Sequence, residues 1–126
     1  MEPRETDSEF NAAVDWVLAH PSREKVFPQW SDEQIKAAYR LCRQQDAALF
    51  FYGHQKQIVG TLLAAVYPEI SRIHVLGVIG SKREIGRAVA AWAARYPTFQ
   101  ASGSRSGKCV FYPLKTLCRL LHLTQP

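Results

Sequence analysis

The chain has 126 residues, of which 47% are hydrophobic and 21% are charged, with seven Gly and seven Pro. These values exclude two domains, wholesale disorder and collagen-like architecture, and they predict a single domain over residues 1–126. The formal net charge of +5 is unevenly distributed, because residues 1–69 carry seven basic and ten acidic residues whereas residues 70–126 carry nine basic residues and one acid. The basic half predicts an anionic partner, although a solvated basic face would have the same composition.

Three cysteines without Cys-x-x-Cys spacing predict a reducing, cytoplasmic setting rather than a disulfide framework. Cys118 and His122 have the spacing of a metal-binding pair on a helix, but two ligands do not make a site, and no metal is predicted. The acidic, polar N-terminus is unlike a signal peptide, and no apolar run approaches the ~20 residues of a membrane span. The composition leaves the oligomeric state open.

The first helix is predicted over residues 6–20, because Thr6 and Glu9 form a capping-box pattern and an apolar face follows. A loop over residues 21–30, with two prolines, leads to a second helix over residues 31–45. The Ser-x-x-Gln capping box at the start of the second helix is the clearest local signal in the chain.

An apolar strand over residues 48–52 and a longer one over residues 57–67 predict an antiparallel hairpin. The run 72–79 is almost wholly apolar and is predicted to be a central strand. The rest of the chain predicts a helix over 83–96, a strand over 98–102, a Gly-Ser loop over 103–108, a strand over 109–112 and a last helix that begins at Pro113. The helical periodicity over 83–96 predicts a core face of Ile85, Val89, Trp92 and Tyr96. This order predicts an α+β fold with a mixed sheet.

The junction between the central strand and the next helix is the main candidate site. Ser81 and Glu84 form another capping box, which explains much of the sequence structurally. Lys82 and Arg83, however, place two cations in the first turn, where the helix dipole disfavours each by about 0.3–1 kcal/mol. A bound anion would reverse that cost, so the junction predicts a phosphate or carboxylate site.

The same junction resembles the pyrophosphate-binding turn of the GNAT acetyltransferases, because Arg83-x-x-Gly86-x-Ala88 follows a central strand and opens a helix. The resemblance implies a GNAT-like fold, a mixed and mostly antiparallel sheet flanked by helices. The usual first GNAT strand is not evident. The resemblance also implies that the donor's phosphates are held by Lys82, Arg83, Gly86, Arg87 and Ala88.

Within that superfamily, residues 10–120 are similar in segment order to the toxin-activating lysine acyltransferases, which acylate RTX haemolysins from acyl carrier protein. Short matches lie around Trp16, Phe27-Pro28, Arg95-Tyr96-Pro97 and Gly107-Lys108-Cys109-Val110. The catalytic histidine of that family aligns with Glu24, and its aspartate aligns with Gly77. If both side chains are replaced, His20 or Glu24 remains to deprotonate the amine. His74 is a third titratable group on the central strand, on the face predicted to be shared with Leu76 and Val78, where a satisfied core histidine is more typical.

Two functions follow from these observations. In the first, an acyltransferase moves an acyl group from acyl-CoA or acyl carrier protein to an amine. In the second, a catalytically lapsed GNAT-like domain, of a kind that phages and plasmids carry, binds a protein or nucleic acid through its basic half. Arg105 and Lys108 in the Gly-Ser loop are a further candidate anion site, but the loop lacks the spacing of a P-loop, which argues against nucleotide hydrolysis.

Overall fold

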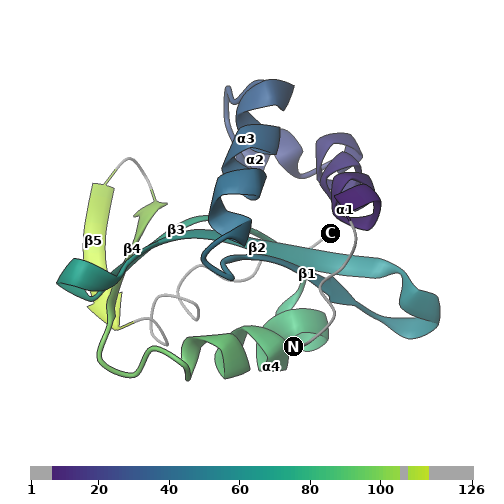
Figure 1. The fold of residues 1–126 in the computed structure, drawn as a ribbon. Coiled ribbons are helices and arrows are strands. Elements are labelled where there is room, and N and C mark those ends of the chain that lie inside the picture. Colours follow the sequence, from purple (N-terminus) through teal and green to yellow (C-terminus); the bar gives the residue numbers. More distant parts are fainter. Residues whose placement is uncertain (1–6, 106–107, 114–126) are drawn as a thin grey trace.

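The computed structural model describes residues 7–105 and 108–113. In this described part of the chain, helices cover both faces of one sheet (Figure 1). The α+β prediction is confirmed. The helices are α1 (Asp7–Ala19), α2 (Arg23–Val26), α3 (Asp32–Arg43) and α4 (Lys82–Ala93).

The five strands of the sheet lie in the same order as in the sequence. Neighbouring strands are antiparallel except for the third and fourth, which are parallel and are joined across the sheet face by α4. The third strand lies in the middle of the sheet, as its apolar sequence predicts. The strands are β1 (Ala48–Tyr52), β2 (Ile58–Tyr67), β3 (Arg72–Ile79), β4 (Gln100–Arg105) and β5 (Lys108–Pro113).

Three sequence predictions require correction. The stretch predicted as a loop over residues 21–30 contains the short helix α2. The Gly-Ser stretch is not a six-residue loop, because β4 continues to Arg105, β5 begins at Lys108, and these two residues are paired across the strands. Pro113 is the last residue of β5 rather than the first residue of a helix. The helix predicted after Pro113, and the Thr6 cap of α1, lie outside the described residues.

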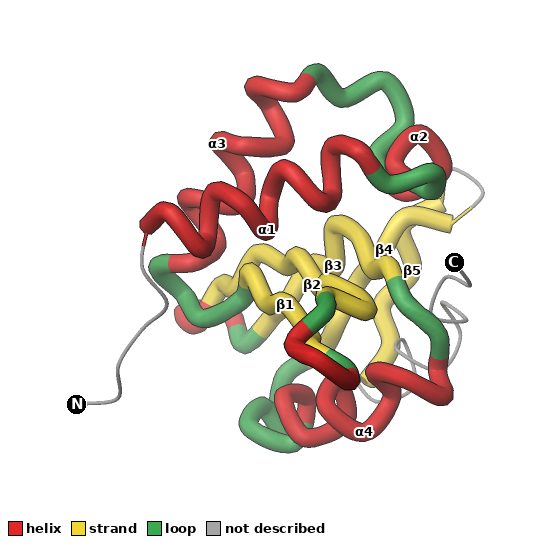
Figure 2. The backbone as a smooth tube through the Cα atoms, turned by 90° about the vertical axis from the view of Figure 1, so that its right-hand side faces the viewer, coloured by secondary structure: helices red, strands yellow, loops and turns green. Residues whose placement is uncertain are grey.

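Each face of the sheet has its own hydrophobic core. On one face, α4 contributes Ile85, Val89 and Trp92, as its periodicity predicts. On the other face, α1 and α3 pack their apolar residues, among them Phe10 and Tyr39, against β1, β2 and β3. Figure 2 shows the same two layers in a perpendicular view. The sheet is therefore covered on both faces where the candidate site lies.

Polar contacts join the layers at a few points inside the core. The Tyr39 hydroxyl lies 2.8 Å from Thr61 Oγ1, and this Thr61 hydroxyl donates to the Leu49 carbonyl, also at 2.8 Å. Burial raises the pKa of the Tyr39 phenol, although the hydrogen bond with Thr61 opposes that shift. On the other face, Trp92 Nε1 donates to the Asp46 carbonyl at 3.1 Å and ties α4 to the turn before β1.

The helix caps follow the sequence closely at α3. Ser31 accepts the N–H of Gln34 on its side chain, and the Gln34 side chain accepts the N–H of Ser31, so the predicted capping box is confirmed.

Within the residues that the structure describes, no helix combines the length and the apolar composition that spanning a bilayer requires.

Candidate functional site

The central strand β3 contains a β-bulge. Leu63 of β2 lies opposite Gly77, but the next residue, Ala64, lies opposite Val75, so Leu76 is an extra residue on β3. A bulge interrupts the alternation of faces. Leu76 and Gly77 consequently both face the layer of α1, α2 and α3, whereas Val78 packs in the core beneath α4. His74 shares its face with Leu76, as predicted, but not with Val78.

The sheet divides at this bulge. Parallel pairing between β3 and β4 covers only Arg72–Val75 and Gln100–Gly103. Beyond that point β3 continues with β2 to Ile79, and β4 continues with β5 to Arg105. In both views the β4–β5 hairpin turns toward the helical layer that contains α2 (Figures 1 and 2). The bulge therefore lies where the two halves of the sheet diverge.

Gly80 makes the turn from β3 into α4. Its φ of 130° is a backbone conformation that residues with a side chain rarely adopt. A Cβ at this position would also lie 2.7 Å from Ile85 Cδ1, well inside the normal contact distance. The turn therefore depends on glycine, and it holds the N-terminus of α4 close to the end of β3.

The N-terminus of α4 carries the predicted cofactor-binding residues. Ser81 Oγ accepts the Glu84 N–H at 3.1 Å and lies 3.0 Å from Glu84 Oε1, to which it donates. Glu84 thus bonds the Ser81 hydroxyl, whereas the predicted capping box would have it accept the Ser81 backbone N–H. Lys82 and Arg83 are exposed, and neither belongs to any ion pair found within residues 7–100.

The next turn of α4 continues this surface. Arg87 is exposed one helical turn after Arg83, Gly86 is half-buried and Ala88 is exposed. The predicted donor-binding residues therefore share the first two turns of one helix. Arg105 and Lys108 do not join them, because the β4–β5 hairpin bends away from α4 toward the opposite layer (Figure 1).

The predicted catalytic residues lie on the other face of the sheet, His20 just before α2 and Glu24 within it. His20 Nδ1 accepts the Ser22 N–H at 3.0 Å, and the imidazole lies against Trp16 with ring centroids 4.8 Å apart. Burial lowers the pKa of His20. In the neutral ring the proton then resides on Nε2, so the nitrogen able to accept a proton is the one that Ser22 already occupies. Glu24 is exposed, and its carboxylate lies 4.0 Å from Arg23 Nε.

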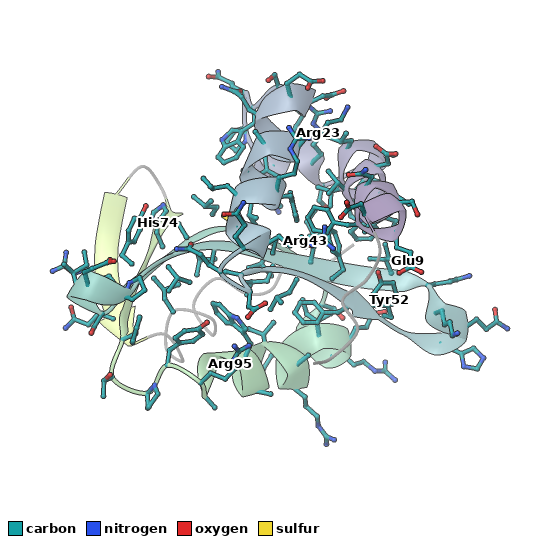
Figure 3. The ribbon with its side chains drawn as sticks, viewed as in Figure 1. Glu9, Arg23, Arg43, Tyr52, His74 and Arg95 are labelled. Carbon is teal, nitrogen blue, oxygen red and sulfur yellow. The ribbon has the colours of Figure 1, made fainter. Side chains whose placement is uncertain are left out.

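His74 lies on β3, two residues before the bulge, on the side of the sheet that faces α1, α2 and α3 (Figure 3). It is half-buried, and burial lowers its pKa, so the neutral imidazole predominates at neutral pH. Of the three titratable groups that the sequence suggests, His74 is the one on the strand that carries the bulge.

Gly77, which the predicted alignment places at the aspartate of the lysine acyltransferases, has no room for a side chain. A Cβ built there would lie 2.6 Å from Val26 Cγ1 and 2.7 Å from two ring carbons of Phe27. Phe27 is fully buried, so it cannot swing aside without leaving the core. An isolated Gly within an apolar strand signals a bulge or a close backbone approach. That signal was present in the sequence, but it does not identify Phe27 as the neighbour.

A surface groove of about 300 Å³ runs between α1 and α3, on the face opposite α4. Its floor is Phe10 and Val14, and its walls carry charged side chains from both helices. Among the described residues there is no cluster of three or more His, Cys, Asp or Glu side chains that could hold a metal ion. Because the groove lies between α1 and α3, it is on the opposite face of the sheet from the α4 N-terminus and is separate from it.

Comparison with known proteins gives no match, since no protein-family model, no curated protein and no solved structure matches the chain.

Proposed function

We propose that the chain binds a thioester acyl donor, either acyl-CoA or acyl carrier protein, in a GNAT-like fold and transfers the acyl group to an amine. The observation that carries this proposal is that the bulge at Leu76 coincides with the end of the β3–β4 ladder. Bulges of this kind redirect backbone groups next to active sites. Backbone N–H groups at the divergence would polarise the thioester carbonyl and stabilise the oxyanion that forms on it.

The reaction is a simple aminolysis. The amine nitrogen attacks the thioester carbonyl carbon, a C–N bond forms, and the C–S bond breaks as the tetrahedral intermediate collapses. The amine loses one proton to a base, and the departing thiolate takes up one proton, so the protein ends the cycle unchanged. What the chain must supply is an oxyanion donor, a site for the phosphate arm of the donor and a proton acceptor.

The N-terminus of α4 supports the second of these requirements. Lys82 and Arg83 are exposed in its first turn, where the helix dipole disfavours cations. Arg87, one turn after Arg83, adds a like charge at i, i+4 spacing, which is itself unfavourable. A bound phosphate group would convert both effects into favourable interactions.

His74 is the residue best suited to accept the proton. It lies on the same strand and the same face as Leu76, and its neutral form can take up a proton at neutral pH. Replacing His74 with Gln should lower the rate of acyl transfer while donor binding at α4 is retained. Retained transfer by the His74→Gln variant would return the role of base to His20, Glu24 or solvent.

Thermal unfolding with and without CoA or an acyl-CoA tests donor binding directly. A donor at about a hundred times its dissociation constant stabilises the fold by about 2.7 kcal/mol, which raises Tm by several degrees. Arg83→Glu should abolish this protection. Arg40→Glu, an equivalent charge reversal at an exposed residue of α3, should leave it intact. Absence of protection by CoA, acyl-CoA and acyl carrier protein alike would refute the proposal.

The packing at Gly77 favours a second candidate, the catalytically lapsed domain. Val26 and Phe27 occupy the space that a side chain would need at position 77, the predicted counterpart of that family's aspartate. In that case the basic half serves to bind a protein or a nucleic acid. Titration with a duplex oligonucleotide at two salt concentrations tests the nucleic-acid form, because phosphate contacts make affinity fall steeply with salt. No binding even at low salt would exclude it.

A further inference from the structure

The bulge on β3 is covered on both faces of the sheet, but the two covers are unequally anchored. On one face α4 buries four residues, Ile85, Val89, Trp92 and Ala93. On the other face lies the segment Arg23–Trp30, here called the α2 cap, which consists of α2 and the loop that follows it. The α2 cap has one buried residue, Phe27, which contacts Gly77, and no residue of α2 itself is buried. Because the α2 cap buries one residue where α4 buries four, the α2 cap is the cover that opens at lower cost.

The α2 cap is held closed by one arginine. Arg23 forms an ion pair with Asp32 at the start of α3, and its Nη2 donates to the Trp30 carbonyl at 3.1 Å. Figure 3 shows Arg23 within the layer formed by α1, α2 and α3. These two contacts join the beginning of the α2 cap to its end and to the helix beyond it.

The closed α2 cap contains a buried hydrogen-bond donor without a hydrogen-bond partner and a residue with an unfavourable backbone conformation. Arg23 Nε is buried and has no hydrogen-bond partner within the described residues, and the Glu24 carboxylate lies 4.0 Å from it, too far for a hydrogen bond. Gln29, inside the α2 cap, has a φ of 66°, a left-handed conformation that is unfavourable for a residue with a side chain. A segment with a buried donor that makes no hydrogen bond and with a strained residue opens at lower cost than one without them.

We propose that the α2 cap is an autoinhibitory contact that blocks access to the β3 bulge, and that release of Arg23 from Asp32 opens it. The inference rests on the proposed function in one respect, namely that the bulge is where acyl transfer occurs. A donor bound where the β3–β4 pairing ends leaves an incoming amine only the two faces of the sheet as approaches. Both faces are filled by a hydrophobic core, but the α2 cap is the less deeply anchored cover, so the amine approaches where Phe27 and Val26 now lie.

Amide hydrogen exchange at Leu76 and Gly77 measures this opening without reference to activity. Asp32→Asn removes the negative charge that pairs with Arg23, and exchange at these two amides should become about five to ten times faster. Glu33→Gln is the matched control, because Glu33 is also an acid in the first turn of α3 but pairs with Lys36 instead. Exchange at Leu76 and Gly77 in the control should equal that of the unmodified protein.

A second variant keeps the test independent of α3. Arg23→Lys retains the charge but loses the forked geometry that reaches both Asp32 and the Trp30 carbonyl, so it should also accelerate exchange at the bulge. If Asp32→Asn and Arg23→Lys both exchange at the rate of Glu33→Gln while remaining folded by circular dichroism, the α2 cap is not a gate and the proposal is overturned.

The activity measurement separates this inference from the proposed function. With acyl-CoA and an amine, Asp32→Asn should transfer faster than the unmodified protein, and Glu33→Gln should transfer at the same rate. If the donor protects the fold but opening the α2 cap leaves the transfer rate unchanged, autoinhibition is refuted and the donor site stands. If no donor binds at all, the proposed function is refuted, and autoinhibition of acyl transfer is refuted with it, whatever the exchange rates show.

Discussion

The contact between Gly77 and Phe27 gives the sharpest test of the site geometry. In Gly77→Ala the new methyl carbon would lie 2.7 Å from the Phe27 ring and 2.6 Å from Val26 Cγ1. Carbon atoms pack best at about 3.5–4.0 Å, so the ring or the strand must move by roughly 1 Å. Overpacking of this kind lowers the free energy of unfolding by about 1–3 kcal/mol. Alanine fits a strand better than glycine by up to about 1 kcal/mol, which leaves a net loss of about 1–2 kcal/mol.

A double-mutant cycle assigns this loss to the contact itself. Phe27→Leu shortens the side chain, and alone it should cost about 1–2 kcal/mol. Combined with Gly77→Ala it should cost less than the sum of the two, with a coupling of at least about 0.5 kcal/mol. The free energies come from urea unfolding monitored by tryptophan fluorescence.

Phe51→Leu is the matched control for this cycle, because Phe51 is a half-buried aromatic residue that packs in the core beneath α4. Its effect should add to that of Gly77→Ala without coupling, since the two residues face different layers. The packing described for the bulge would be refuted if Gly77→Ala were as stable as the unmodified protein. It would also be refuted if the coupling energy of Gly77→Ala with Phe51→Leu equalled that with Phe27→Leu.

Three other predictions concern stability. Tyr39→Phe should lower the free energy of unfolding by about 1–2 kcal/mol in urea, because Thr61 loses its buried hydrogen-bond partner, and an unchanged midpoint would contradict that bond. Burial lowers the pKa values of His20 and His74 below 6.5, so in the window beneath pH 6.5 the unfolded chain binds more protons than the folded one. The contribution of these two neutral histidines to the free energy of unfolding is therefore complete above pH 6.5 and is lost as the pH falls toward their folded pKa values. A variant with Gln at both positions should show a smaller drop in urea midpoint between pH 7.5 and 5.0. Gln29→Gly should raise the free energy of unfolding by about 1 kcal/mol, measured as a higher Tm, because its φ of 66° suits glycine.

The parts of the fold that the sequence predicted well have strong local signals. The Ser31 capping box, the apolar strand β3 and the buried stripe of α4 depend on residues within a few positions of one another, and all three are confirmed. The prediction of a loop for the Gly-Ser stretch around Arg105 is wrong, because it depends on composition alone, which favours a loop. The strand pairing of β4 with β5 outweighs that weak preference, as tertiary context commonly does in sheets.

The parts of the site that escaped prediction depend on contacts between distant segments. Leu76 looks like any other apolar strand residue, and its place in a bulge follows only from the register with β2. The helix α2 is four residues long, too short for periodicity to reveal it. The position of Phe27 over Gly77 joins residues fifty positions apart, which no local pattern encodes. The catalytic assignments remain predictions, because they depend on this long-range geometry.

The order of the strands, which is the same in the sheet as in the sequence, has a consequence for how the chain acquires its structure. The hairpins β1–β2, β2–β3 and β4–β5 each join neighbours in the sequence, so every one can close a short loop before the rest of the sheet exists. Only the four-residue junction of β3 with β4 must wait for α4 to form and pack. We therefore expect the first three strands to assemble early during synthesis, and the β4–β5 hairpin to dock last across the parallel ladder, which is shorter than the three antiparallel ones.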